Sequence, residues 1–160
     1  MSYDLMVFDT EAPPPDRAAF LQWYSEQTKW VEDHAYDDVA VTNPKLRNWY
    51  LEMIQEYPPM NGPDAVDNPD NPRVTDYSIG KAVIYACFAW SQAESARADT
   101  FRLAEKHGVG FFDASANDGG VWVPTSNGYL CVHGNRSGRT TLTSVVKKLL
   151  SLFSRRFGAE

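Results

Sequence analysis

The segment from Asn43 to Pro59 constrains the fold of this chain more than any other part of the sequence. Asn43 and Pro44 are favoured at the N-cap and at the first position of a helix. The apolar side chains that follow recur at the spacing of one helix face: Leu46, Trp49, Tyr50, Met53, Ile54 and Tyr57. The Pro58-Pro59 pair ends the pattern, because proline cannot continue a helix. A helix that is apolar on one side must pack against a second layer of structure.

Short apolar runs predict the strands of that layer. Residues 3–9 alternate between two faces, and residues 77–88 predict one long strand, or a strand with a β-bulge at Gly80, at the centre of the sheet. Turn sequences, Asn-Asp-Gly-Gly and Thr-Ser-Asn-Gly, separate three further runs. They predict an antiparallel meander over residues 109–114, 121–124 and 129–133.

Three further helices are expected. Pro14 or Pro15 opens one over residues 15–29 with Asp16 in its first turn, and Gly108 stops another over residues 90–106. The last, over residues 139–157, has a leucine and phenylalanine stripe opposite lysine and arginine. The order β-α-α-β-α-β-β-β-α predicts a single α+β domain over residues 1–160, in which helices pack on one face of a mainly antiparallel sheet.

The composition predicts a cytoplasmic chain with a packed core. Its 160 residues suit one domain, and 43% of them are hydrophobic. The sequence has no secretory signal and no apolar stretch of membrane-spanning length. Cys87 and Cys131 lie in apolar runs, which predicts buried thiols in a reducing compartment.

Charge is distributed unevenly along the chain. Residues 1–135 hold 9 Lys or Arg and 20 Asp or Glu, a net charge of -11, whereas residues 136–160 hold six basic residues and one acidic residue. An acidic body repels phosphate backbones and attracts basic partners. We therefore expect no nucleic-acid binding by the main domain.

The sequence predicts no catalytic residue, cofactor or metal site. The glycines of Gly134-Asn-Arg-Ser-Gly138-Arg lack the spacing and the lysine of a phosphate loop. Cys131 and His133 share a strand face, but a zinc site needs three or four ligands. His34 and His107 have no neighbouring histidine or cysteine at ligand spacing.

The candidate partner-binding residues lie in two acidic segments, one after the first expected helix and one within residues 58–75. Residues 58–75 form a long connection rich in proline, asparagine and aspartate, and such connections are commonly functional or disordered. Trp30 follows the first expected helix and is the expected aromatic anchor. The candidate acids are Glu32, Asp33, Asp37, Asp38, Asp64, Asp67 and Asp70.

Five segments carry a resemblance to known proteins: Ser2-Tyr-Asp-Leu, Pro59-Met-Asn-Gly-Pro, Thr75-Asp-Tyr-Ser-Ile-Gly, Phe88-Ala-Trp-Ser and His107-Gly-Val-Gly-Phe-Phe-Asp. Over about residues 2–124, the chain resembles a family of short, functionally uncharacterised bacterial proteins. The resemblance carries over no active-site residue. In size, acidity and α+β make-up the chain is also similar to immunity proteins that neutralise polymorphic or type VI secreted toxins.

These observations favour a protein-binding role, with an immunity protein acting on a basic toxin domain as the specific expectation. A small enzyme or small-molecule binder is the alternative, with a pocket between the aromatic helices and the sheet that uses His107 and Asp113 at the end of a strand. A third interpretation makes the basic segment 139–157 a membrane or partner-docking helix. Packing of that helix on the sheet is the expectation we prefer, so we expect no membrane partner.

Overall fold

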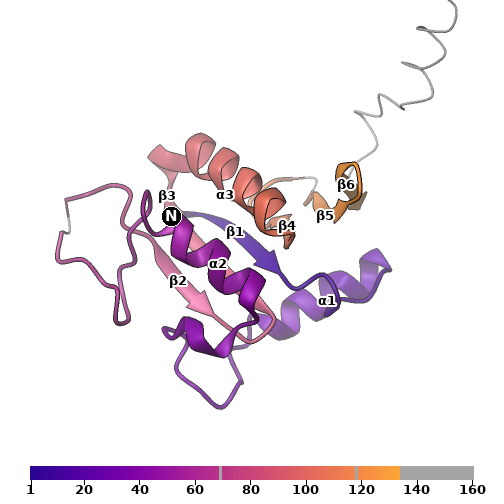
Figure 1. Ribbon diagram of the computed structural model, residues 1–160, viewed down its shortest axis with the longest axis horizontal. Helices are drawn as coiled ribbons and strands as arrows, with labels where there is room; N and C mark the ends of the chain where they lie inside the picture. The colour runs from indigo at the N-terminus through magenta and orange to yellow at the C-terminus, as the bar shows by residue number, and fades with distance from the viewer. Residues whose placement is uncertain (69, 118, 134–160) are drawn as a thin grey trace, which may run out of the picture.

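The computed structural model describes residues 1–68, 70–117 and 119–133. They form one antiparallel six-stranded sheet with three α-helices, which confirms the predicted α+β class (Figure 1). The strands are β1 (Ser2–Phe8), β2 (Asp76–Ile79), β3 (Val83–Ala89), β4 (Gly110–Asp113), β5 (Val121–Thr125) and β6 (Gly128–His133), in the spatial order β2-β3-β1-β4-β5-β6. The helix predicted over residues 139–157 lies outside the described residues.

The sequence marks the start of α1 (Arg17–Gln27), the start of α2 (Pro44–Met53) and the end of α3 (Ala93–His107). Helix α2 ends at Met53, before the predicted stop at Pro58-Pro59. In α2, the Asn43 side chain accepts a hydrogen bond from the Leu46 N–H at 3.0 Å, as predicted. Asp16 is the N-cap of α1, bonded to the Ala19 N–H, rather than a residue of its first turn. Gly108 ends α3 in the left-handed conformation at φ 66°. Short 3-10 turns lie at η1 (Val39–Val41) and η2 (Trp90–Gln92).

The prediction of one long strand around Gly80 is wrong, because this segment forms an antiparallel hairpin. Strands β2 and β3 pair with Ile79 opposite Ile84, and residues 80–82 make the turn. The Glu32 carboxylate accepts a hydrogen bond from the Lys81 N–H at 3.1 Å, so a distant loop holds this turn in place. The hairpin also lies at one edge of the sheet rather than at its centre, because β2 is an edge strand and β1 lies between β3 and β4.

The predicted meander is confirmed, since β4, β5 and β6 pair in succession with antiparallel register. Gly110 lets β4 approach β1, because a Cβ at that position would lie 2.2 Å from the ring of Phe8. The first strand of the chain thus pairs with two later ones, through Phe8 opposite both Val83 and Gly110.

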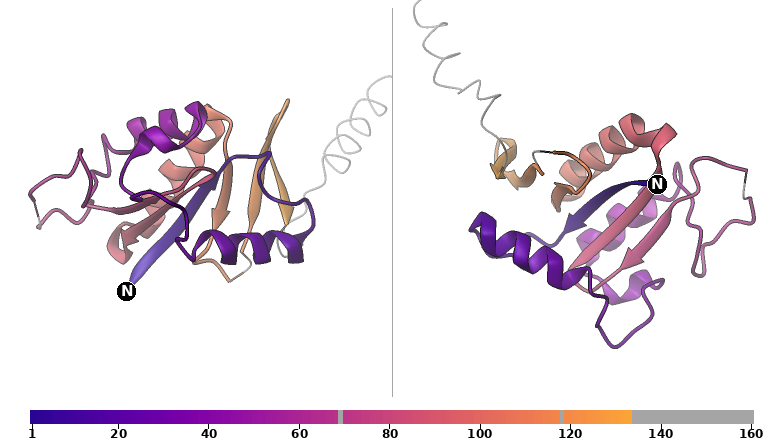
Figure 2. Two further views of the ribbon diagram at one scale, coloured as in Figure 1. Left: turned by 90° about the horizontal axis from the view of Figure 1, so that it is seen from below. Right: turned by 180° about the vertical axis from the view of Figure 1, so that it is seen from behind.

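The sheet buries a different apolar cluster on each face, because successive strand residues point to opposite sides. Helices α2 and α3 cover the larger cluster, which includes Leu5, Trp49 and Phe88. Helix α1 covers the smaller cluster on the other face, where Phe20 packs with Phe8. Figure 2 shows α2 and α3 on one face and α1 on the opposite one, so α1 departs from the predicted arrangement with all helices on one face.

Candidate partner-binding surface

The sheet face on which α1 packs has a polar part that is only partly covered. Tyr77, Ala86 and Tyr3 point into the core of α2 and α3, so the alternate residues of these three strands point the other way. In the view from behind in Figure 2, α1 lies beside this part of the sheet rather than over it. The polar residues there are Asp4 of β1, Tyr85 and Cys87 of β3, and Asp76 and Ser78 of β2, all partly buried.

Hydrogen bonds link this open sheet face, defined by those five residues, to α1. The Tyr24 hydroxyl donates to the Tyr85 hydroxyl at 3.4 Å, and the Tyr85 hydroxyl donates to Asp4 Oδ2 at 3.1 Å. Burial, followed by the neighbouring Tyr24 and Asp4, raises the pKa of Tyr85. The face therefore presents a phenol whose hydroxyl already donates to the Asp4 carboxylate.

The Cys87 thiol lies in the register between two carboxylates, opposite Asp4 on one side and opposite Asp76 on the other. Burial is the main cause that raises the pKa of this thiol to about 12, and the Asp4 carboxylate adds to the shift. Because the thiolate is the nucleophile, a thiol with this pKa is unreactive near neutral pH. Cys87 thus contributes to the surface as a small, weakly polar side chain.

Trp30 lies at the border of the open sheet face. Its ring packs edge-on against Tyr85 at a centroid distance of 6.0 Å and against Tyr36 at 5.2 Å. Its φ of 53° is uncommon for a bulky residue that is not glycine. Strained residues of this kind often serve a function, so the geometry is consistent with the predicted anchor.

Glu32 is held by internal contacts, which the sequence did not indicate. Its Oε2 atom contacts His34 Nε2 at 2.5 Å and accepts the Lys81 N–H. The carbonyl of Ala35, which contacts the other ring nitrogen, and the Glu32 carboxylate raise the pKa of His34. Glu32 therefore positions the turn after β2 and leaves the other candidate acids as the more available groups.

Asp37 and Asp64 come together from two loops. Burial is the main cause that raises the pKa of Tyr50 to about 12, and both carboxylates add to it, Asp64 more than Asp37. Gly62 lies against the Asp37 backbone, since a Cβ there would be 2.7 Å from the Asp37 carbonyl oxygen. The two predicted acidic segments therefore meet beside α2 and form one acidic loop surface, which we define as residues 28–42 and 58–75.

The remaining candidate acids differ in what they contact. Asp38 caps the η1 turn by accepting the Ala40 N–H at 2.8 Å. Asp33, Asp67 and Asp70 are exposed on the same acidic loop surface. These three side chains are therefore accessible to a partner.

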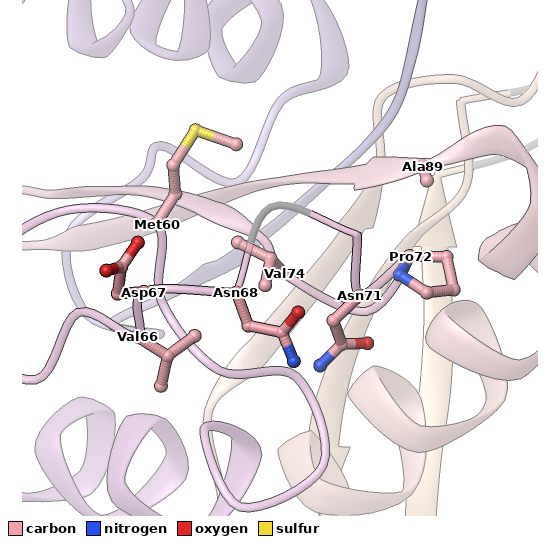
Figure 3. A pocket seen from close by; sticks show the side chains of 8 residues that line it. All are labelled: Met60, Val66, Asp67, Asn68, Asn71, Pro72, Val74 and Ala89. Atoms are coloured by element: carbon pink, nitrogen blue, oxygen red, sulfur yellow. The ribbon is translucent and has the colours of Figure 1, made fainter.

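A pocket of about 490 Å³ lies under the 58–75 loop at the end of β3, lined in part by Asp67 (Figure 3). Met60, Val66 and Val74 supply apolar walls, whereas Asn68 and Asn71 supply amide groups. The sequence marked this loop only by its composition, because the pocket also needs Ala89 from a strand that follows the loop.

His107 and Asp113, which the small-enzyme or small-molecule-binding alternative places at its site, are held by different partners. Asp113 is buried, where its Oδ2 atom accepts the Tyr3 hydroxyl at 2.9 Å and Arg97 Nε at 2.8 Å. His107 instead contacts Glu52 at 2.8 Å. Arg97 and His107 lie ten residues apart on α3, which corresponds to roughly 15 Å along a helix. The two residues therefore belong to separate ion pairs.

The prediction of two buried thiols is wrong for Cys131, which is exposed on β6, and only partly correct for Cys87. The apolar run around Cys131 belongs to the last strand of the sheet, so one side of it has no covering layer among the described residues. The described residues contain no group of three His, Cys, Asp or Glu side chains that could hold a metal ion.

Comparisons with protein-family models, with curated proteins and with solved structures found no match for this chain. The resemblance to a family of short bacterial proteins therefore stays an expectation from sequence. Within the described ranges, no helix combines the length and the apolar character that a membrane crossing requires.

Proposed function

We propose that this chain is a protein-binding protein whose partner presents a basic surface, and specifically that it is an immunity protein that neutralises a bacterial toxin by direct contact. The contact surface joins the open sheet face to the acidic loop surface. Trp30 is its aromatic anchor, and Asp4 and Asp76 extend it beyond the acids that the sequence indicated.

The position of Trp30 is the observation that supports this proposal most. A half-buried tryptophan held at positive φ and packed on Tyr85 matches the aromatic anchors that dominate protein interfaces. The two loops also carry seven acidic side chains and two basic ones, and Arg73, one of the two, is paired with Glu56. Such a charge excess attracts a basic partner and accelerates association.

The test is capture of the partner from the native host on the immobilised full chain, followed by binding kinetics. We expect Trp30→Ala to weaken affinity by about 30-fold, the effect of losing a hot-spot residue. We expect Asp4→Asn with Asp76→Asn to slow association by about tenfold at low salt, with the difference shrinking as salt rises.

Glu94→Gln with Glu105→Gln is the matched control, because these exposed acids lie on α3, away from the proposed surface. It should change the association rate by less than about twofold. An association rate that is independent of salt, or an equal effect of both acid pairs, would contradict the proposed surface.

A further inference from the structure

The pocket under the 58–75 loop adjoins the open sheet face. Ala89 lines this pocket and lies two positions beyond Cys87 on β3, so strand alternation directs both side chains to the same side of the sheet. Ala89 is also opposite Ser2 in the register of β1, two positions before Asp4. The open sheet face therefore ends, at this end of β3, in a pocket of about 490 Å³. We call it the loop pocket.

The body of the loop pocket is apolar. Met60, Val66 and Val74 provide aliphatic surface, and Met60 and Val66 are 59% and 39% exposed. Exposed apolar side chains grouped around a hollow are typical of interaction sites. The volume of about 490 Å³ also lies within the range of roughly 300–1,000 Å³ that ligand sites have. The pocket therefore suits a ligand with an apolar stem.

The polar groups of the loop pocket are one carboxylate and two side-chain amides. Among the described residues, none donates a hydrogen bond to the Asp67 carboxylate or to the Asn68 side-chain oxygen. Asn71 Oδ1 accepts the Arg73 N–H at 3.0 Å, which leaves the Asn71 amide NH₂ group as a donor. Figure 3 shows that the amides of Asn68 and Asn71 point to the same side of the loop. The pocket thus offers acceptors for a charged donor and one donor for a carbonyl.

Charge around the loop pocket favours a cation. The residues that line it include Asp67 and no lysine, arginine or histidine. Arg73, the only basic residue of the 58–75 loop, is held elsewhere, because Nη1 contacts Glu56 at 2.7 Å and the guanidinium lies over the ring of Tyr57. Asp76 follows the lining residue Val74 by two positions and adds a second carboxylate. Such a field attracts cations and repels anions.

We propose that the loop pocket receives an arginine side chain of the protein partner. The aliphatic walls pack on the arginine stem, and the guanidinium donates to the Asp67 carboxylate and the Asn68 side-chain oxygen. The Asn71 amide donates to the backbone carbonyl of that arginine. Arginine fits better than lysine, because its guanidinium is less strongly hydrated and pairs with a carboxylate through two hydrogen bonds. The inference rests on the proposed function for the partner being a protein, and it adds a second anchor point to Trp30.

Titration of the isotope-labelled full chain with N-acetyl-L-arginine amide, followed by NMR, tests the pocket without the partner. We expect saturable chemical-shift changes at the backbone amides of Asp67, Asn68 and Ala89, with a Kd on the order of 1 mM. N-acetyl-L-citrulline amide has the same shape without the charge and should bind at least about tenfold more weakly. Equal affinity for the two probes, or the absence of saturable shifts at these amides, overturns the proposal.

Two variants locate the binding. Asp67→Asn removes the carboxylate of the pocket and should weaken binding of the arginine probe by about tenfold. Glu105→Gln is the matched control, because it removes one negative charge from an exposed site on α3, and it should change the affinity by less than about twofold. An equal effect of the two variants overturns the proposal.

Ala89→Leu fills the pocket from β3 and keeps its charge. It should abolish saturable binding of the arginine probe, and an unchanged melting temperature shows that the variant is folded. Unchanged probe affinity in the folded variant overturns the proposal. Micromolar binding of free agmatine, a small guanidinium compound, would identify a small-molecule site and would overturn the assignment to a partner's arginine.

Binding kinetics with the captured partner separate this inference from the proposed function. If Asp67→Asn and Trp30→Ala each weaken the affinity for the partner, both are supported. If Trp30→Ala alone weakens it, the loop pocket does not hold an arginine of the partner, whereas the proposed function stands.

Discussion

The two faces of the sheet use their residues in different ways. On the face of α2 and α3, large aromatic side chains such as Trp49, Tyr77 and Phe88 are fully buried and pack mainly edge-on. On the face of α1, the covered part is apolar but the part around Asp4 and Cys87 is polar and half-buried. The first face is closely packed throughout, whereas the second leaves a polar part of the sheet only partly covered.

This difference follows from alternation along single strands. In β3, Phe88 enters the core whereas its neighbour Cys87 lies on the open sheet face. The same backbone therefore presents a structural residue and a surface residue one position apart. Substitutions at adjacent positions of β3 therefore compare how much each face contributes to the free energy of unfolding.

The largest effect is expected from Phe88→Ala. Phe88 is 1% exposed and packs edge-on against Tyr57 at 5.2 Å, so truncation leaves a cavity. We expect the free energy of unfolding to fall by about 3–5 kcal/mol, measured by urea denaturation. A loss below about 1 kcal/mol would mean that the core collapses around the gap and that this face is not closely packed.

The second-largest effect is expected at alkaline pH, which should lower the free energy of unfolding through buried tyrosines of the face covered by α2 and α3. Burial is the main cause that raises the pKa of Tyr3, and likewise that of Tyr50, from 10.0 to about 12. A raised folded-state pKa contributes stability that is complete below pH 10 and is lost as pH rises through about 12. We expect a loss of roughly 2 kcal/mol for each of these tyrosines across that interval, because one pKa unit corresponds to about 1.4 kcal/mol.

Denaturation midpoints on both sides of that interval, with tyrosinate absorbance recorded in parallel, measure this effect. Tyrosines that ionise at pH 10 while the fold stays intact would show that these phenols are open to water and would remove the contrast between the faces.

The smallest effect is expected from Cys87→Ala, one residue before Phe88. The side chain is small and only partly buried, so we expect a change of less than about 1 kcal/mol in the free energy of unfolding. The same urea denaturation measures it beside Phe88→Ala. A cost close to that of Phe88→Ala would show that the open sheet face is itself a second core.

Local signals in the sequence predicted the helices well, because capping and helical spacing act within a few residues. Asn43, Pro44 and Gly108 placed helix ends correctly. The turn at Gly80 was not predicted, since it has no Asn-Gly or Asp-Gly pair and is held by Glu32, 49 residues earlier. The stripe of α1 likewise gave no indication of which sheet face it covers, because both faces offer apolar residues.

The candidate surface was predicted in part. Trp30 and the exposed acids could be named from the sequence alone. Asp4, Asp76 and Tyr85 could not, because β1 and the β2–β3 hairpin, which are far apart in sequence, bring them together. Polar residues at every second position of these strands were the available signal. The opposite error concerned Glu32, whose charge is visible in sequence but whose internal contacts are not.

The central position of β1 has a consequence for the newly made chain. Its neighbours end at Ala89 and Asp113, so β1 has neither pairing partner until synthesis has reached Ala89. At translation rates of about 5–20 residues per second, both edges of an apolar strand stay unpaired for several seconds. Chaperone capture or aggregation of this protein during translation should therefore begin at β1.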